Sequence, residues 1–270
     1  MPDKIVMLTN GNIHGIDILQ GLAKKGIKID VVLENHPRIS DNLSKSNSKP
    51  TLVNWLKALK RWYLRKRASK YALEKLSLMA KELHSTGPIN SKRMKNSLRG
   101  LKPDYIILGG IGILHDSVIK IARKGVLNTH PGILPWARGS GVVGRSIQSG
   151  IACGGTCHYV NSGIDKGDFI QRRLLRLDGD EKSLGEIEHK AHLLVVEMMV
   201  DTVLGILETG NKPEHVVQVK KYKIYKTLSQ SDRKVIDQMV IDEKAWSLFE
   251  SWQDKSLGEP LYILPGKFQG

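Results

Sequence analysis

Apolar and polar residues along the chain follow two alternating periods, which predict an α/β protein. Residues 4–9 (KIVMLT) form a short apolar run that is typical of a buried strand, and the turn-forming residues 10–15 follow it. An amphipathic helix is predicted to about residue 25, and a second strand over residues 27–34. A strand, a helix and a strand at this spacing indicate a parallel sheet with a right-handed crossover.

The same pattern resumes after an interruption near Asn35. It predicts strands over residues 104–110 and 126–129, with a helix over 116–123 between them. A short helix over 142–149 leads to strands over 152–160 and 169–177, which the turn at 161–167 joins as a hairpin. A long helix is predicted from Ser183, its N-cap, to Thr209, with Gly210 ending it. A short strand is expected near residues 216–219. We therefore predict a Rossmann-like, mostly parallel sheet.

Charge sets one segment apart from the rest of the chain. The net charge is +15, but residues 45–102 contain sixteen Lys or Arg residues against Glu74 and Glu82, so that +1 remains elsewhere. From about Thr51 to Leu83 the segment reads as a basic amphipathic helix that includes Trp55 and Trp62. It is expected either to solvate its charges while packing on the core, or to contact an anionic acceptor, a nucleic acid or an anionic membrane surface.

The length allows one large core with a small appendage. We expect a catalytic domain over residues 1–210 with a basic helical insertion at about 45–102, and a short C-terminal extension over 211–270. The two cysteines, Cys153 and Cys157, are spaced poorly for a disulfide within one strand, and no signal peptide or membrane span is evident. These features favour a cytoplasmic location.

Candidate chemistry lies at the predicted strand over residues 126–129. Asn128 and His130 stand two residues apart at its carboxyl end, where open α/β sheets bind ligands and where both side chains point the same way. Asp165 lies in a glycine-bounded turn that could reach the same crevice. An amide, an imidazole and a carboxylate together can stabilise an oxyanion and move a proton, and they provide no obvious nucleophile.

Two sequence motifs carry a family resemblance. LNTHPGILP at 127–135, followed by Arg138 and Gly139, and GTCHYV at 155–160 with GIDKGD at 163–168, resemble the signature of the folate-dependent formyltransferases. That family includes methionyl-tRNA, glycinamide ribonucleotide and amino-sugar N-formyltransferases, and formyltetrahydrofolate hydrolase. The resemblance covers residues 4–34 and 105–210, and it implies the formyltransferase fold with 10-formyltetrahydrofolate as formyl donor.

The resemblance also implies roles for individual residues. Asn128 would bind the formyl oxygen as it becomes an oxyanion, His130 would help stabilise that charge, and Asp165 would orient His130 and a water that transfers the proton. The folate would lie against Ile111, Gly112, Ile113, Leu114, Gly163 and Ile164. The acceptor would contact Asn12, Ile13, His14, Gly15, Arg138 and His158, the early turn corresponding to a phosphate site at a helix N-terminus. The acceptor is expected to be a small primary amine, anionic in character, such as an amino sugar or another metabolite.

Several departures keep alternatives open. The loop after Arg138 lacks the proline that many relatives have, and the C-terminal β-barrel of the methionyl-tRNA enzyme would not fit after Gly210. A formyltetrahydrofolate hydrolase would use the same residues with water in place of the amine. A nucleic-acid- or membrane-binding protein on the same scaffold is the other alternative. No metal site is predicted, because His189 and His192 lack a third ligand. The sequence leaves the oligomeric state and the identity of the amine open.

Overall fold

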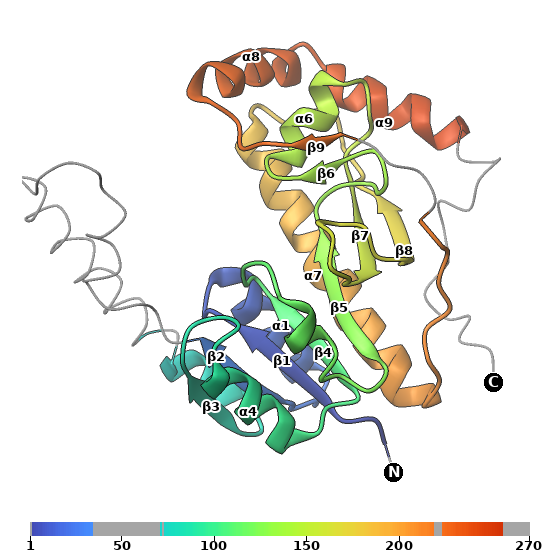
Figure 1. Ribbon diagram of the computed structural model, residues 1–270. Coiled ribbons are helices and arrows are strands. Elements are labelled where there is room, and N and C mark those ends of the chain that lie inside the picture. Colours follow the sequence, from blue (N-terminus) through green and yellow to red (C-terminus); the bar gives the residue numbers. More distant parts are fainter. Residues whose placement is uncertain (1, 35–70, 72, 219–222, 256–270) are drawn as a thin grey trace, which may run out of the picture.

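The fold is built on one seven-stranded sheet in a computed structural model that describes residues 2–34, 71, 73–218 and 223–255 (Figure 1). The strand order is β3 (Leu83–Thr86), β2 (Asp30–Glu34), β1 (Ile5–Thr9), β4 (Tyr105–Gly109), β5 (Gly125–His130), β7 (Gly154–Tyr159) and β8 (Phe169–Leu174). The first five strands are parallel, whereas β7 and β8 are antiparallel to their neighbours. The predicted mostly parallel α/β sheet is confirmed.

Helices cover both faces of this sheet. Helices α1 (Ile13–Lys24) and α7 (Leu184–Thr209) share a core with Met7 and its neighbours on one face. On the other face, α4 (Lys92–Leu101) and the short α5 (Asp116–Ile119) share a core with Val6. Val6 and Met7, which are neighbours in β1, are both fully buried. Successive side chains of a strand point to opposite faces, and each face has its own helical layer.

Capping residues set both ends of α7, as the sequence predicts, and the start of α1. The Ser183 side chain accepts a hydrogen bond from the backbone N–H of Glu186 at the start of α7, and Gly210 ends the helix at a φ of 69°. At the start of α1, the Asn12 side chain accepts from Gly15. These caps satisfy terminal backbone groups that the helices leave unpaired.

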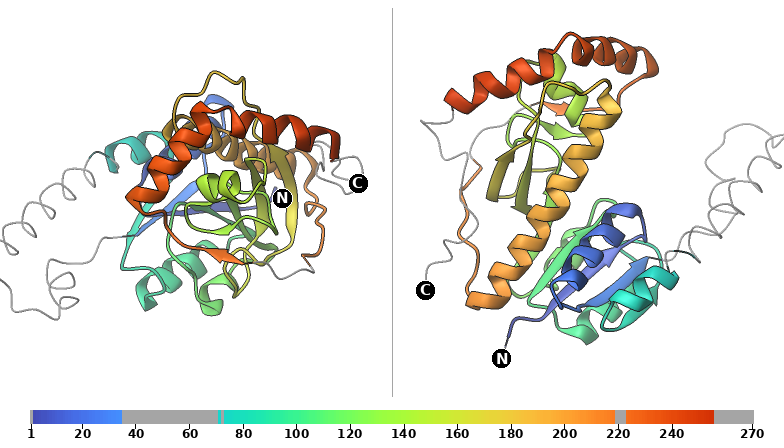
Figure 2. Two further views of the ribbon diagram at one scale, coloured as in Figure 1. Left: turned by 90° about the horizontal axis from the view of Figure 1, so that it is seen from above. Right: turned by 180° about the vertical axis from the view of Figure 1, so that it is seen from behind.

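A second core lies at the far end of β7 and β8. Helix α7 runs behind the sheet and connects the two cores, as Figure 2 shows. The second core contains Ile147, Ile236 and Phe249. Its other elements are α6 (Val142–Gln148), α8 (Gln230–Ile241) and α9 (Lys244–Lys255), and next to them β6 (Arg138–Gly139) pairs with β9 (Ile224–Tyr225). Residues 224–249 are therefore packed onto the preceding domain.

The predicted boundary of the basic insertion is wrong at its C-terminal end. Strand β3 pairs with β2, and α4 packs Met94 and Leu98 into the main core, so residues 83–101 belong to the sheet and its helical layer. The helix expected to about Leu83 ends at residue 79, and most of it, residues 35–70 and 72, lies outside the described residues. The role of that segment stays a prediction.

The structure also tests several predictions about short elements and the two cysteines. The helix expected over residues 116–123 is the four-residue α5, and the strand expected over 216–219 is an isolated bridge between Val216 and Phe169. Cys153 and Cys157 are both free thiols, and both are buried. Among the described residues, no helix has the length and apolar composition needed to cross a bilayer.

Candidate active site

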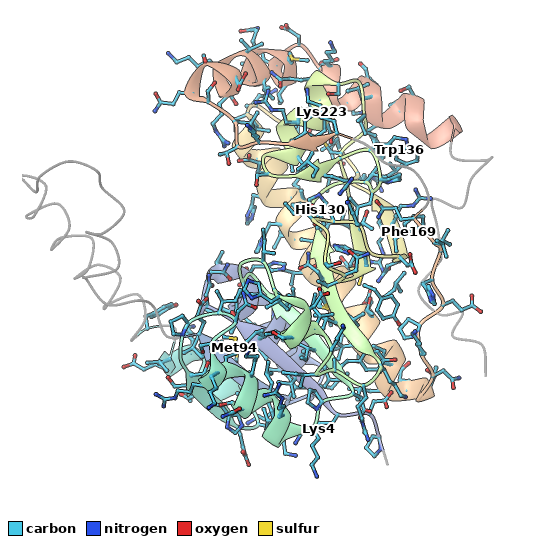
Figure 3. All side chains as sticks on the ribbon, viewed as in Figure 1. Lys4, Met94, His130, Trp136, Phe169 and Lys223 are labelled. Carbon is cyan, nitrogen blue, oxygen red and sulfur yellow. The ribbon has the colours of Figure 1, made fainter. Side chains whose placement is uncertain are left out.

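The site is built around the carboxyl end of β5. Alternation along the strand sends Asn128 and His130 to the face that carries α4 and α5, and sends Thr129 to the opposite face, where its hydroxyl lies 3.4 Å from Nε2 of His14 on α1. His130, at the end of the strand, is buried on the first face. Figure 3 shows His130 there, between the regions of Met94 and Lys223.

Asn128 is held by a buried histidine from the neighbouring strand β7. Nδ2 of Asn128 lies 3.3 Å from Nε2 of His158, whose Nδ1 lies 2.8 Å from the backbone oxygen of Tyr159. Because that oxygen only accepts, Nδ1 carries the proton and Nε2 is the acceptor. Burial lowers the pKa of His158 to about 4, although the Asp165 carboxylate opposes this shift, so the ring is neutral at pH 7. One N–H of Asn128 is thereby fixed, and its second N–H stays available to a ligand.

His130 is held by the loop that follows β5. Its Nε2 donates to the backbone oxygen of Ala137 over 2.7 Å, which leaves Nδ1 directed at Asp165, 3.8 Å from Oδ2. Gly132 permits this arrangement, since a Cβ at that position would lie 2.8 Å from the Ala137 oxygen and 3.0 Å from Nε2 of His130. The ring is thus held between the Ala137 carbonyl and the Asp165 carboxylate.

Asp165 reaches the site from the turn between β7 and β8. Its backbone is left-handed, with a φ of 46°, a conformation that Asp tolerates better than most residues. Oδ2 accepts a 2.8 Å hydrogen bond from the backbone N–H of Gly139, and Oδ1 lies 3.9 Å from Nε2 of His158. A guanidinium nitrogen of Arg138 donates to the backbone oxygen of Ile164. Hydrogen bonds thus join strand β6 to the turn next to the Asp165 carboxylate.

These groups open onto a cavity of about 760 Å³, within the usual range for ligand pockets. Asn128, His130, His158 and Asp165 line it, as do all six residues predicted to hold the donor. The remaining lining residues are Leu108, Gly139, Ser140, Val160, Asn161, Ile224, Tyr225, Lys226 and Thr227. The wall from Ile111 to Leu114 is uncharged, and Ile113 and Ile164 are 71% and 41% exposed, so a flat apolar ring system could lie against it.

Five of the six predicted acceptor contacts, all but His158, lie outside this cavity lining. Arg138 is only 2% exposed, and its guanidinium donates a hydrogen bond to the Ile164 carbonyl. This geometry does not support a contact with the acceptor. The turn of Asn12, Ile13, His14 and Gly15 lies at α1, on the Thr129 side of β5. Asn12 caps α1 and donates to the Gly110 carbonyl, and a Cβ at Gly15 would lie 2.8 Å from the Gly109 oxygen. The phosphate role of this turn stays a prediction.

The residues that the sequence did not indicate come mainly from one segment. Residues 224–227 follow Gly210 by more than a dozen positions, and only the pairing of β9 with β6 brings them to the cavity. A two-residue strand has no periodic pattern, so no signal in the sequence could have placed them. The backbone N–H of Gly139 was missed for another reason, since its partner Asp165 is distant in sequence.

Two groups of side chains in the described part of the chain could offer several ligand atoms to a metal ion. They are Asp30, Glu82 and His84, and Asp178, Asp180 and Glu181. Neither group lines the cavity. Asp30 forms an ion pair with Lys4. Burial raises the pKa of the Glu181 carboxyl, but its ion pair with Lys190 and hydrogen bonds from backbone N–H groups lower it further, so that the net shift is downward. In each group, one carboxylate is thus paired with a lysine.

The half-buried His14 should make stability depend on pH. Burial, helped by His192, lowers the pKa of His14 from 6.5 to about 4. As the pH falls below 6.5 the unfolded chain therefore takes up a proton before the folded chain does, and the free energy of unfolding decreases until about pH 4. Between pH 7 and pH 5 we expect His14→Gln to lose about 1–2 kcal/mol less than the wild type. Urea unfolding at both pH values measures this, and equal losses would contradict it.

Gly139 should be intolerant of any side chain. Its φ is 96°, and a Cβ would lie 2.3 Å from the Tyr225 oxygen and 2.8 Å from Cγ2 of Ile224. Gly26 is the matched control, because its φ is 75° and no atom lies within 4 Å of its Cβ position. We expect Gly26→Ala to lower the free energy of unfolding by about 1 kcal/mol, and Gly139→Ala by about 2–4 kcal/mol, in chemical denaturation. Equal effects would show that β9 is not seated on β6.

Comparison with known proteins places this chain in a family. A family model described as "Formyl transferase" matches residues 4–203. The chain is 28% identical over 161 residues to a methionyl-tRNA formyltransferase of Syntrophomonas wolfei, a match that covers 58% of this chain and 50% of that protein. A match to the methionyl-tRNA formyltransferase of Alkaliphilus oremlandii, 26% identical, covers 66% and 63%. The chain spans about half the length of the curated relatives it matches.

Solved structures share the fold. A 4-N formyltransferase from Francisella tularensis has a TM-score of 0.53 at 18% identity, over 88% of this chain and 87% of that one. A phosphoribosylglycinamide formyltransferase from Anaplasma phagocytophilum has a TM-score of 0.56 at 14% identity, over 84% and 100%. At such identities the likeness concerns the fold alone, whereas the family model covers well over half of the sequence. This chain belongs to the formyl transferase family.

Proposed function

We propose that this protein transfers the formyl group of 10-formyltetrahydrofolate to the primary amine of a small acceptor, without a covalent enzyme intermediate. The observation that carries the proposal is the convergence of Asn128, His130 and Asp165 on one cavity at the end of β5. Membership of the formyl transferase family gives the reaction class. Among the described side chains that line the cavity there is no Cys, and none has a nucleophile with a partner base in place, which favours direct attack by the amine.

The donor fits the residues present. The uncharged wall of Ile111 to Leu114 and the partly exposed Ile164 offer apolar surface to a ring system, and Asn128 stands at its inner end. The donor, when bound there, supplies an activated formyl carbon. Asn128 directs its second N–H at the formyl oxygen and stabilises that oxygen as it gains negative charge. His130 lines the same side of the cavity, with Nδ1 3.8 Å from Oδ2 of Asp165.

The acceptor amine needs to lose a proton as its nitrogen bonds to the formyl carbon. Asp165 is the carboxylate that lines the cavity, and it lies next to His130, so it is placed to accept this proton directly or through a water. The bond between the formyl carbon and the folate nitrogen breaks, and that nitrogen receives the proton. The tetrahydrofolate product then leaves with no change of charge on the protein.

The test is turnover with an amine panel. We expect tetrahydrofolate and a formylated amine to appear together when the protein receives 10-formyltetrahydrofolate and its acceptor, as absorbance and mass spectrometry measure. The panel includes amino sugars, aminated ribonucleotides and methionyl-tRNA. Methionyl-tRNA is included because matched relatives are methionyl-tRNA formyltransferases. Formate released without any acceptor would instead favour the hydrolase. If calorimetry detects no folate binding, the transferase and the hydrolase assignments are both wrong.

The basic segment is proposed to contact an anionic partner. Residues 45–70 carry nine Lys or Arg residues and no acidic residue, enough to give a binding affinity that falls steeply with salt. Binding to a short RNA and to anionic vesicles is to be measured over a salt series. Undetectable binding to both at low ionic strength would leave only the interpretation of a solvated face.

A further inference from the structure

The segment Ile224–Tyr225–Lys226–Thr227, here called the β9 wall, forms one side of the cavity although it follows the family-matched region. Strand β9 pairs in parallel with β6, with Gly139 opposite Tyr225. The backbone N–H of Ser140 donates to the Tyr225 oxygen over 3.0 Å, and the hydroxyls of Tyr225 and Ser149 lie 3.0 Å apart. These contacts hold the β9 wall against the loop that contains Gly139.

That loop also holds the carboxylate that the proposed reaction needs. The backbone N–H of Gly139 donates to Oδ2 of Asp165 over 2.8 Å. Tyr225 of the β9 wall is paired with Gly139, and Gly139 binds the carboxylate that would take the proton of the attacking amine. Since that amine needs to lie next to Asp165, the β9 wall adjoins the acceptor, whereas the wall of Ile111 to Leu114 stands on the β4 side of the cavity.

Charge distinguishes the β9 wall from the rest of the lining. Lys226 is the only Lys or Arg among the described residues that line the cavity. Its side chain is exposed, and no carboxylate of the described residues lies within ion-pair distance of its ammonium group. The nearest other lysine in sequence among the described residues, Lys223, is outside the lining and stacks on the Tyr225 ring at 5.8 Å. Lys226 thus offers a positive charge to whatever enters the cavity beside Asp165.

We propose that Lys226 binds an anionic group of the acceptor and makes this enzyme specific for small amines that carry a phosphate or a carboxylate. The inference rests on the proposed formyl transfer and adds to it the residue that selects the acceptor. Lys226 contributes no step of the chemistry. It anchors the acceptor so that its amine lies between the formyl carbon and Asp165, and it acts through a charge-assisted hydrogen bond.

The test compares three amines that differ in one substituent, namely glucosamine, glucosamine 6-phosphate and 2-amino-2-deoxyglucuronic acid. Their binding to the full chain is measured by calorimetry in the presence of 5-formyltetrahydrofolate, an unreactive formyl folate. We expect the wild type to bind at least one charged amine about 10-fold or more tightly than glucosamine. Lys226→Met should abolish this preference, Lys226→Arg should keep most of it, and Lys223→Met, the matched control, should leave it unchanged.

The two charged probes separate the sources of the anion, since preference for one identifies phosphate or carboxylate. The inference is overturned if the wild type shows no preference, or if the preference survives in Lys226→Met. It is also overturned if Lys226→Met weakens binding of the formyl folate instead, because the lysine would then serve the donor's carboxylates. Failure of the proposed function looks different, since the wild type would then bind no formyl folate.

Discussion

Asn128→Ala is expected to lower kcat/KM for formyl transfer by about 10²–10³-fold, the usual effect of removing one oxyanion donor. His158 fixes one N–H of the Asn128 amide, so that the other points into the cavity and needs no reorganisation when the formyl oxygen becomes negative. Steady-state kinetics with 10-formyltetrahydrofolate and an active amine from the panel measure the effect. The loss should fall mainly on kcat, because the interaction strengthens in the transition state.

A matched variant separates the donor from the shape of the side chain. Asn128→Asp keeps the size but replaces an N–H donor with an acceptor, so it should lose at least as much activity as Asn128→Ala. Both variants should unfold at a somewhat lower temperature than the wild type, since each leaves Nε2 of the buried His158 without its donor. Activity above half of the wild-type value in Asn128→Ala would refute its role as the main oxyanion donor.

The sequence predicted most of the sheet because each buried strand is a run of apolar residues next to a turn. It failed at β3, whose sequence Leu83–His–Ser–Thr86 is polar and short, as edge strands often are. The following helix, α4, buries only Met94 and Leu98 and carries several charges. A charged helix of this kind resembles a solvated segment, so both elements were assigned to the basic insertion.

The candidate site was predictable where local geometry decides it. Asn128 and His130 lie at one strand end, and a spacing of two residues places both on the same face. The role of His158 as the partner of Asn128 depends on the register of β5 with β7, which the sequence does not reveal. Arg138 shows the same limit, since a charged residue in a motif suggests a ligand contact, yet here it holds the turn that carries Asp165.

Asp165→Asn should cause the largest loss of activity, about 10²–10⁴-fold in kcat, because the amide oxygen cannot take the proton of the attacking amine. The substitution should leave the site intact. Asn also tolerates a left-handed backbone, and its oxygen can still accept the hydrogen bond from Gly139. Rapid-quench turnover with saturating donor and acceptor measures kcat, and thermal unfolding within a few degrees of the wild type would show that the turn is preserved.

Asp165→Ala is the informative contrast, because it removes both the proton acceptor and the partner of Gly139. It should lose as much activity as Asp165→Asn, and it should also unfold at a lower temperature, since alanine pays the left-handed strain of about 1–2 kcal/mol without any hydrogen bond in return. If Asp165 only held the turn, Asp165→Asn would retain activity while Asp165→Ala lost it. More than a tenth of wild-type kcat in Asp165→Asn would therefore assign the carboxylate to structure, and the proton would have to leave the amine by another route.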